Sequence, residues 1–453
     1  MGRFLFKRKT HVKESAQKPP KRKALDEEEI SSDEDFSGTE DRHEDYSDEE
    51  YEDVQAKAHR EAKQLLKSLE ADAVDEETGE IDNEAIAHRL QEDALAKYHK
   101  LRRQLADEAV FFDESSNAFA THRYSVISAV FFPDNSECFV SCGKDGSIVK
   151  YDTENRKTLG RIQYYPKNSD NHKGGVTALA VSPDGRWIVS GGSDNVVKVW
   201  DFKTLRLVHN FLGHRGPITS VVFRRGSSAE LFSGSKDRSV KAWNLDQFGY
   251  VDTSYGHQDS VSQIDMLAKE RVLSVGSHDK TARFWKVDTE SQLIFNGSKH
   301  AISIDTCSLI NEDHFVTGSS DGSISIWSVF KKKPVVTIPC AHGKTDGVPN
   351  WIVSVAAAKY SDLVASGSCD GFIRYWKISS DYKSMTEIGC IRQPGFINDM
   401  QFSEDAKKLL VAVGQEHKSG RWWKADEGRN AVFVAYIGYM DAEAKAFCDG
   451  VLC

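Results

Sequence analysis

Residues 234–243 read GSKDRSVKAW, and this pattern of a glycine, a short polar turn and a tryptophan recurs along the chain beyond residue 140. In each copy an aspartate or its replacement precedes an aromatic residue by six positions, and successive copies lie 42 to 49 residues apart. A period of this length is typical of a repeat architecture. The seven pairs are Asp145/Tyr151, Asp194/Trp200, Asp237/Trp243, Asp279/Trp285, Asp321/Trp327, Asp370/Trp376 and His417/Trp423.

A histidine lies 21 to 28 residues before six of these seven turns. Between the histidine and the turn lie alternating apolar runs such as ITSVVF at 218–223, which predict strands packed between neighbouring units. Seven small antiparallel sheets of this kind close a propeller, so we expect an all-β, seven-bladed β-propeller over residues 110–453. The histidines are His122, His172, His214, His257, His300 and His342.

These residues resemble the WD-repeat family over roughly the last 330 residues. The resemblance implies that, in each blade, the aspartate of the tight turn accepts a hydrogen bond from the histidine, which is linked through a Ser or Thr hydroxyl to the tryptophan indole. Blade one has Tyr151 in place of the tryptophan, and blade four has Val275 at the position of the hydroxyl. The complete tetrads are His172/Ser190/Asp194/Trp200, His214/Ser233/Asp237/Trp243, His300/Thr317/Asp321/Trp327 and His342/Ser366/Asp370/Trp376.

The recurring Ser, His and Asp do not predict a hydrolase, because an active site is needed once and this set occurs in most blades. Residues 343–345 read GKT like the end of a phosphate-binding loop, but Ile338 stands where the first glycine of that motif belongs. The eight cysteines form no CxxC pair, so we expect free thiols and neither a metal nor a cofactor. The sequence therefore predicts a protein that is not an enzyme.

Residues 1–53 form a charged arm that we expect to be disordered, basic first and then acidic. The first 23 residues hold nine basic side chains and one acid, and residues 26–53 hold 16 acids and one arginine. Two basic clusters 11 residues apart predict a bipartite nuclear localisation signal: Lys7, Arg8, Lys9 and Lys21, Arg22, Lys23. Four serines in the acidic stretch suit an acid-directed kinase: Ser31, Ser32, Ser37 and Ser47.

Residues 54–109 predict a charged helical segment with a narrow apolar stripe, which either packs lightly on the propeller or lies against a partner. No stretch of about 18 apolar residues occurs, so we expect no membrane partner and a protein that stays inside the cell. The stripe consists of Ile86, Leu90, Ala94, Tyr98, Leu101 and Leu105.

More specific strings are similar to one family, the WD-repeat protein specific to the U3 small nucleolar ribonucleoprotein. They include KDRSVK at 236–241, NEDH at 311–314, GFIN at 395–398 and, above all, VGQEHKSGRWW at 413–423. The resemblance implies a protein of the nucleus and nucleolus that binds the box B/C element of U3 small nucleolar RNA together with a kink-turn-binding protein. It also implies contacts with other pre-ribosomal assembly proteins and a role in pre-ribosomal RNA processing for the small subunit.

Basic residues on two sets of turns are the candidates for RNA contact. We favour the face of the tight turns, because blade seven replaces its aspartate by His417 and adds Lys418 and Arg421 beside two tryptophans. The other candidates on that face are Lys236, Arg238, Lys280 and the loop near Lys167, His172 and Lys173. Those on the opposite face are Arg224, Arg225 and the run Lys331 to Lys333.

Two questions stay open at this level. The outer strand of blade seven is either residues 117–121 or residues 431–437, and the second has the stronger strand pattern. The rival function is a nuclear protein-binding scaffold, such as a chromatin protein or a ubiquitin-ligase substrate receptor. Receptors of that ligase kind often carry Trp-Asp-x-Arg, whereas Trp200-Asp201 is followed here by Phe202 and Lys203.

Overall fold

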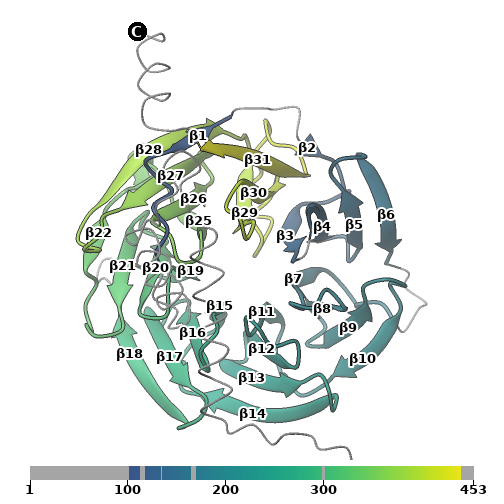
Figure 1. The fold of residues 1–453 in the computed structure, drawn as a ribbon. Helices are drawn as coiled ribbons and strands as arrows, with labels where there is room; N and C mark the ends of the chain where they lie inside the picture. Colours follow the sequence, from purple (N-terminus) through teal and green to yellow (C-terminus); the bar gives the residue numbers. More distant parts are fainter. Residues whose placement is uncertain (1–101, 113–117, 134, 165–169, 298–300, 440–453) are drawn as a thin grey trace, which may run out of the picture. The chain divides into compact units, whose positions relative to one another are not determined.

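The computed structural model describes residues 102–112, 118–133, 135–164, 170–297 and 301–439. Within them the regular structure is β-structure, arranged as seven antiparallel sheets around a central axis (Figure 1). In each of the first six blades the first strand lies nearest the axis and the fourth lies at the rim (Figure 1). The prediction of an all-β, seven-bladed propeller is confirmed.

The strands of the first three blades follow chain order. Blade one contains β3 (Val126–Phe132), β4 (Asn135–Gly143), β5 (Ile148–Asp152) and β6 (Lys157–Ile162). Blade two contains β7 (Val176–Val181), β8 (Trp187–Gly192), β9 (Val197–Asp201) and β10 (Leu207–Phe211). Blade three contains β11 (Ile218–Phe223), β12 (Glu230–Ser235), β13 (Ser239–Asn244) and β14 (Gly249–Tyr255).

The next three blades repeat this order, with a small β-ribbon before blade six. Blade four contains β15 (Val261–Met266), β16 (Arg271–Gly276), β17 (Thr281–Lys286) and β18 (Ser291–Asn296). Blade five contains β19 (Ile304–Leu309), β20 (His314–Ser319), β21 (Ile324–Ser328) and β22 (Val336–Ile338). The ribbon is β23 (Lys344–Thr345) with β24 (Val348–Pro349), and blade six contains β25 (Ile352–Ala357), β26 (Leu363–Ser368), β27 (Phe372–Ile378) and β28 (Met385–Arg392).

The core lies between blades, because each sheet is covered on both faces by its neighbours. Val197 and Val199 of β9 pack with Ile218, Val221 and Phe223 of β11 in one buried cluster. This explains why the inner strands are nearly continuous apolar runs, whereas a rim strand such as β14 is mostly exposed.

The predicted tetrad is present with the expected bonds. In blade three, His214 Nδ1 lies 2.8 Å from the carboxylate of Asp237, and Nε2 lies 2.8 Å from Ser233 Oγ, which also accepts the indole N–H of Trp243 at 2.8 Å. A carboxylate only accepts, so Nδ1 donates and the Ser hydroxyl donates to Nε2. The same set recurs in blades two and six, with His172, Ser190, Asp194 and Trp200, and with His342, Ser366, Asp370 and Trp376.

Blade five shows part of its tetrad. Trp327 donates its indole N–H to Thr317 Oγ1 at 2.8 Å, and Asp321 accepts the hydroxyl of Ser323. His300 lies outside the described residues.

Blade four corrects the sequence analysis. Ser274, and not position 275, supplies the hydroxyl: its Oγ lies 2.7 Å from His257 Nε2 and accepts the indole N–H of Trp285 at 2.7 Å. The segment between the paired residues Val275 and Ala282 is one residue longer than its counterpart in blade three, so a fixed spacing from the aspartate pointed to the wrong position.

The Ser274→Ala variant is expected to lower the free energy of unfolding by about 2 kcal/mol, because it leaves a buried imidazole and a buried indole without their shared partner. Urea unfolding followed by fluorescence measures this. Ser291→Ala, at an exposed rim position of the same blade, serves as the control and should change stability by less than about 0.5 kcal/mol. Equal effects of the two variants would contradict the role of Ser274.

Blade seven also corrects the sequence analysis. Its sheet runs from β29 (Phe396–Phe402) through β30 (Lys408–Gly414) to β31 (Ala431–Tyr439), and two N-terminal strands, β1 (Ala109–Phe111) and β2 (Ala118–Phe119), pair with the outer side of β31. The C-terminal stretch is therefore the third strand. Of the two candidates for the outer strand, residues 117–121 supply it through β2, together with β1, and residues 431–437, which have the stronger strand pattern, do not. Trp423, the aromatic residue of the seventh repeated pair, lies in the connection between β30 and β31 and not in a strand.

The segment before β1 is anchored on blade six. Residues 102–108 contain no helix: Arg103 forms an isolated bridge with Ser361, and the backbone N–H groups of Leu105 and Ala106 donate to Asp362. The helical prediction is thus wrong for these last residues, and its part at 54–101 lies outside the described residues. The predicted nuclear localisation signal and phosphorylation sites also lie outside them.

Candidate RNA interface

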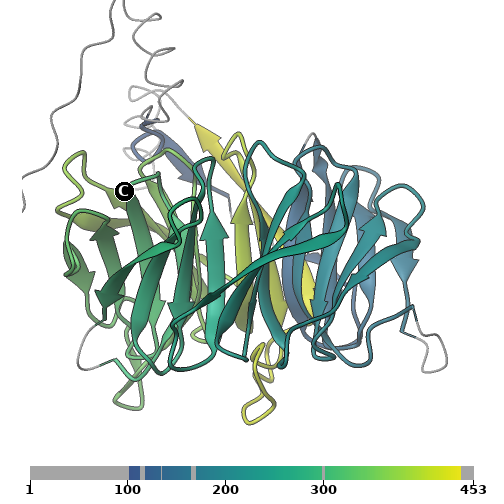
Figure 2. The same ribbon diagram turned by 90° about the horizontal axis from the view of Figure 1, so that it is seen from below.

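The topology places the turns on two faces of the propeller. In a four-stranded meander the turn between the second and third strands lies at the same end as the connection to the next blade, so the Asp turns and the His loops share one face, here called the tight-turn face. The connection of residues 415–430 between β30 and β31, here called the 415–430 loop, belongs to this face. Figure 2 shows it as the yellow-green loop that projects below the strands.

His417 fixes the start of the loop on the inner part of the tight-turn face. Its ring is buried and stacks on Trp351 with the ring centroids 4.7 Å apart, and its Nδ1 accepts the backbone N–H of Ser419 at 3.2 Å. The ring centroid of Trp422 lies 5.5 Å from that of His417, so the loop packs its own aromatic ring against the anchor.

The two tryptophans themselves remain open to solvent. Trp422 is 62% exposed and Trp423 is 47% exposed, although Trp423 touches Phe396 edge to face at 5.2 Å. Large exposed aromatic rings with a fixed base are what unstacked nucleobases bind. Among the described residues, these are the two tryptophans with the most exposed side chains.

Cations from two blades meet at Glu416 in the same loop. Arg421 pairs with Glu416 at 3.2 Å and lies over the ring of Tyr124, with 5.3 Å to the centroid. Lys144, from the tight turn of blade one, donates to the same Glu416 at 3.2 Å and to the carbonyl of Gly420 at 2.9 Å. Glu416 thus holds two cations beside the tryptophans, and Arg421 keeps a largely exposed guanidinium.

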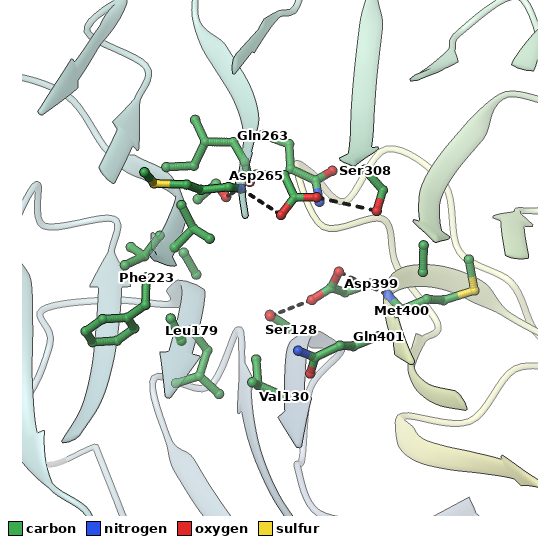
Figure 3. Close-up of a pocket in the computed structure, with 18 of the residues that line it drawn as sticks. Ser128, Val130, Leu179, Phe223, Gln263, Asp265, Ser308, Asp399, Met400 and Gln401 are labelled. Atoms are coloured by element: carbon green, nitrogen blue, oxygen red, sulfur yellow. Dashed lines mark hydrogen bonds between the residues drawn. The ribbon is translucent and has the colours of Figure 1, made fainter. Parts of the chain in front are cut away.

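Lys418 turns away from this surface. Its ammonium donates to the carbonyl of Val353 at 3.2 Å and lines a central cavity of about 570 Å³. Figure 3 shows the polar side chains of that cavity, including Asp399, which accepts the hydroxyl of Ser128 at 2.5 Å. Burial lowers the pKa of Lys418, and Asp399 and Asp305 counteract this. Lys418 anchors the loop in the axis of the propeller and is not placed to meet RNA.

Burial, with Lys418 and Lys144 close by, lowers the pKa of His417 to about 3. The neutral ring is therefore built into the fold, while an unfolded histidine takes up a proton below its ordinary pKa of 6.5. Since the unfolded chain binds the extra proton, stability is full above pH 6.5 and falls as the pH drops from 6.5 toward 3.

The His417→Phe variant keeps a ring against Trp351 but cannot take up a proton. The wild-type protein should lose about 2 kcal/mol more stability than this variant between pH 7.5 and pH 5, at about 1.4 kcal/mol per pH unit below 6.5. Urea unfolding of both proteins at the two pH values measures the difference. If the free energy of unfolding changed equally with pH in the wild type and the variant, His417 would not be held neutral in the fold.

Lys236, Arg238 and Lys280 lie on the tight-turn face as predicted, but in blades three and four. Blades three and four stand across the ring from blade seven (Figure 1), so the structure does not bring these side chains to the 415–430 loop. Arg238 and Lys280 adopt the left-handed φ values of 71° and 55° that their tight turns require.

Arg224 and Arg225 lie on the opposite face and are largely engaged. Arg224 pairs with Glu230 at 2.9 Å and with Glu270 of blade four at 2.7 Å. Arg225 reaches Glu404 of blade seven at 3.2 Å. These ion pairs connect blades, which makes both arginines weaker candidates for RNA than the residues of the 415–430 loop.

Tyr124, Lys144 and Trp351 also belong to this site and were not predicted from the sequence. Tyr124 and Lys144 stand beside the structural His122 and Asp145 of blade one, in loops of the face already favoured. Blades one and seven are neighbours in a closed ring, so that adjacency was a usable signal. Trp351 precedes the first strand of blade six, and its contact with His417 had no signal in the sequence.

The described ranges hold no group of three or more His, Cys, Asp or Glu side chains that would suit a metal ion. Nor does that part of the chain contain a helix long and apolar enough to cross a membrane.

The comparisons with known proteins agree with the propeller fold. The model of the WD domain, G-beta repeat, matches six segments, at 114–152, 165–201, 205–244, 249–286, 290–328 and 333–377, and leaves the irregular blade seven unmatched. The human U3 small nucleolar RNA-interacting protein 2 is 36% identical, over 84% of this chain and 82% of that protein. Ribosomal RNA-processing protein 9 of Saccharomyces cerevisiae is 26% identical, over 82% of this chain and 83% of that protein.

Among solved structures, one described as the structure of U3-55K superimposes with a TM-score of 0.69 at 37% identity, covering 72% of this chain and all of that one. The match to the human protein covers 84% of this chain, whereas the repeat model matches only segments between residues 114 and 377. The chain therefore belongs to the family of WD-repeat proteins that contains the human U3 small nucleolar RNA-interacting protein 2.

Proposed function

We propose that this protein is a non-catalytic RNA-binding component of the U3 small nucleolar ribonucleoprotein. In this role it recognises the box B/C element of U3 small nucleolar RNA together with a kink-turn-binding protein. It acts in pre-ribosomal RNA processing for the small subunit, in the nucleolus and among other pre-ribosomal assembly proteins. The names of the relatives support a role in the U3 small nucleolar ribonucleoprotein and in ribosomal RNA processing. They also support the nuclear localisation that the two basic clusters of the arm predict.

The observation that carries the proposal is the exposed pair of indoles in the 415–430 loop. Trp422 and Trp423 stand beside Arg421, and Tyr124 of the neighbouring blade extends the aromatic surface. A folded RNA element with unstacked bases offers partners for the rings, and its phosphates offer partners for the guanidinium. Lys236, Arg238 and Lys280 would add phosphate contacts across the face without reading bases.

Photo-crosslinking of the full chain to box B/C RNA, in the presence of the kink-turn-binding protein, tests the placement. Mass spectrometry should find the crosslinked nucleotides on peptides that contain Tyr124, Trp422 or Trp423. Crosslinks confined to the rim strands, such as β14 at Gly249–Tyr255, would contradict it.

A further inference from the structure

A basic hollow lies on the opposite face, between the β21–β22 turn of blade five and the β27–β28 turn of blade six. It has a volume of about 580 Å³, and its lining residues in the described part of the chain include four lysines and no carboxylate. We call these lysines the lysine patch: Lys331, Lys332, Lys333 and Lys383. All four are exposed. Lys383 pairs with Asp381 at 3.3 Å, but both side chains are mostly in water, so the pair is easily exchanged for another anion.

The turn that carries Lys383 is held firmly in place. The ring of Tyr382 stacks on His314 with centroids 3.7 Å apart and planes 3° from parallel, while Arg102 covers it at 4.4 Å and Asn311 donates to its hydroxyl oxygen at 2.8 Å. Arg102 also donates to three carbonyls of this turn, those of Ile378, Ser379 and Ser380. The backbone below Lys383 therefore needs no rearrangement to meet a ligand.

An exposed aromatic residue precedes the lysines in the chain. Phe330 directly precedes Lys331 in the β21–β22 turn and is 79% exposed, the largest exposure among the large apolar side chains of the described residues. Lysines beside an exposed ring are what proteins use to bind single-stranded nucleic acid, since the cations follow the phosphates and each base has a face to stack. An acidic polypeptide would satisfy the lysines and leave Phe330 in water.

We propose that the lysine patch and Phe330 form a second RNA-binding surface, which takes a single-stranded segment by its phosphates and stacks one base on Phe330. Because this surface lies on the face opposite the 415–430 loop, the propeller would hold two RNA segments at once, one on each face. The proposal does not depend on the function assigned to the tight-turn face.

The test is fluorescence anisotropy of a labelled twelve-nucleotide oligouridine RNA with the full chain, over a series of salt concentrations. The Lys331→Ala/Lys332→Ala/Lys333→Ala variant should bind at least tenfold more weakly, and its salt dependence should fall by about 2 in slope. Phe330→Ala should weaken binding roughly tenfold with the slope unchanged. Lys407→Ala, an exposed lysine of the same face outside the patch, is the matched control and should stay within twofold of wild type.

Binding of the triple variant within twofold of the wild type would overturn the proposal. So would an unchanged affinity of Phe330→Ala combined with full competition by polyglutamate, because an acidic polypeptide would then be the better occupant. Box B/C binding in the presence of the kink-turn-binding protein reports separately on the tight-turn face, and Phe330→Ala should leave it unchanged.

Discussion

Replacing Arg421 and Trp422 together by alanine is expected to weaken binding to box B/C RNA by roughly 100-fold. The loss combines one stacked base, worth about 1–3 kcal/mol, with one charged phosphate contact. Trp422 is 62% exposed, so its removal opens no cavity in the core, and the anchors His417 and Lys418 keep their contacts with Trp351 and Val353. Filter binding at fixed salt measures the affinity, and circular dichroism checks that the fold is retained.

The matched control removes an exposed ring and an exposed cation elsewhere. Tyr250→Ala combined with Arg206→Ala, on the side of blades two and three, should bind within about threefold of the wild type. A double variant at 421 and 422 that bound as tightly as this control would place the RNA away from the 415–430 loop.

Replacing Phe119 by alanine is expected to lower the free energy of unfolding by about 3–5 kcal/mol. Phe119 lies in β2, pairs with Val432 of β31, and is buried with Phe139 and Tyr151 of blade one. Its ring therefore joins the first and last blades at the point where the propeller closes, and the cavity left by alanine would weaken that junction. Chemical unfolding of the purified protein measures the change.

Phe112 offers the comparison for this second experiment. It follows β1 on the same N-terminal segment, but its side chain is 40% exposed, so Phe112→Ala should cost less than about 1 kcal/mol. If Phe119→Ala lost no more stability than Phe112→Ala, β2 would not contribute to closing the propeller.

The sequence predicted most of the fold because the tetrad residues recur at similar spacings along the chain. In most blades a buried histidine, hydroxyl, aspartate and indole meet, so their spacing along the chain is constrained and repeats. Blade four shows the limit of that argument: one extra residue between paired strands moved the hydroxyl to Ser274, and a fixed offset could not detect it.

The strand assignment in blade seven was not predictable for a related reason. His417 and Trp423 reproduce the six-residue spacing by coincidence, whereas the true third strand, at 431–439, carries no tight-turn aspartate to mark it. That strand is as apolar as an inner strand, so its pattern alone did not say whether another strand covered it. The covering strands are too short, at three and two residues, to give a pattern of their own.

The candidate site was predictable only in its general place. The departure of blade seven from the repeat pointed to the 415–430 loop, and the alternation of turns assigned that loop to the tight-turn face. The direction of each side chain was not predictable, because an irregular loop has no period that assigns residues to the inside or the outside. Lys418 and Arg421 stand three residues apart, yet one enters the central cavity and the other lies on the surface.

We propose that this propeller recognises a defined RNA element. Filter binding of the purified full chain to box B/C RNA and to a scrambled RNA of equal length, with and without the kink-turn-binding protein, tests it most directly. We expect binding that is at least 100-fold tighter for box B/C RNA when the companion protein is present, in the range that separates specific from non-specific complexes. Equal affinity for the two RNAs with the companion present would contradict the account and favour a protein-binding scaffold.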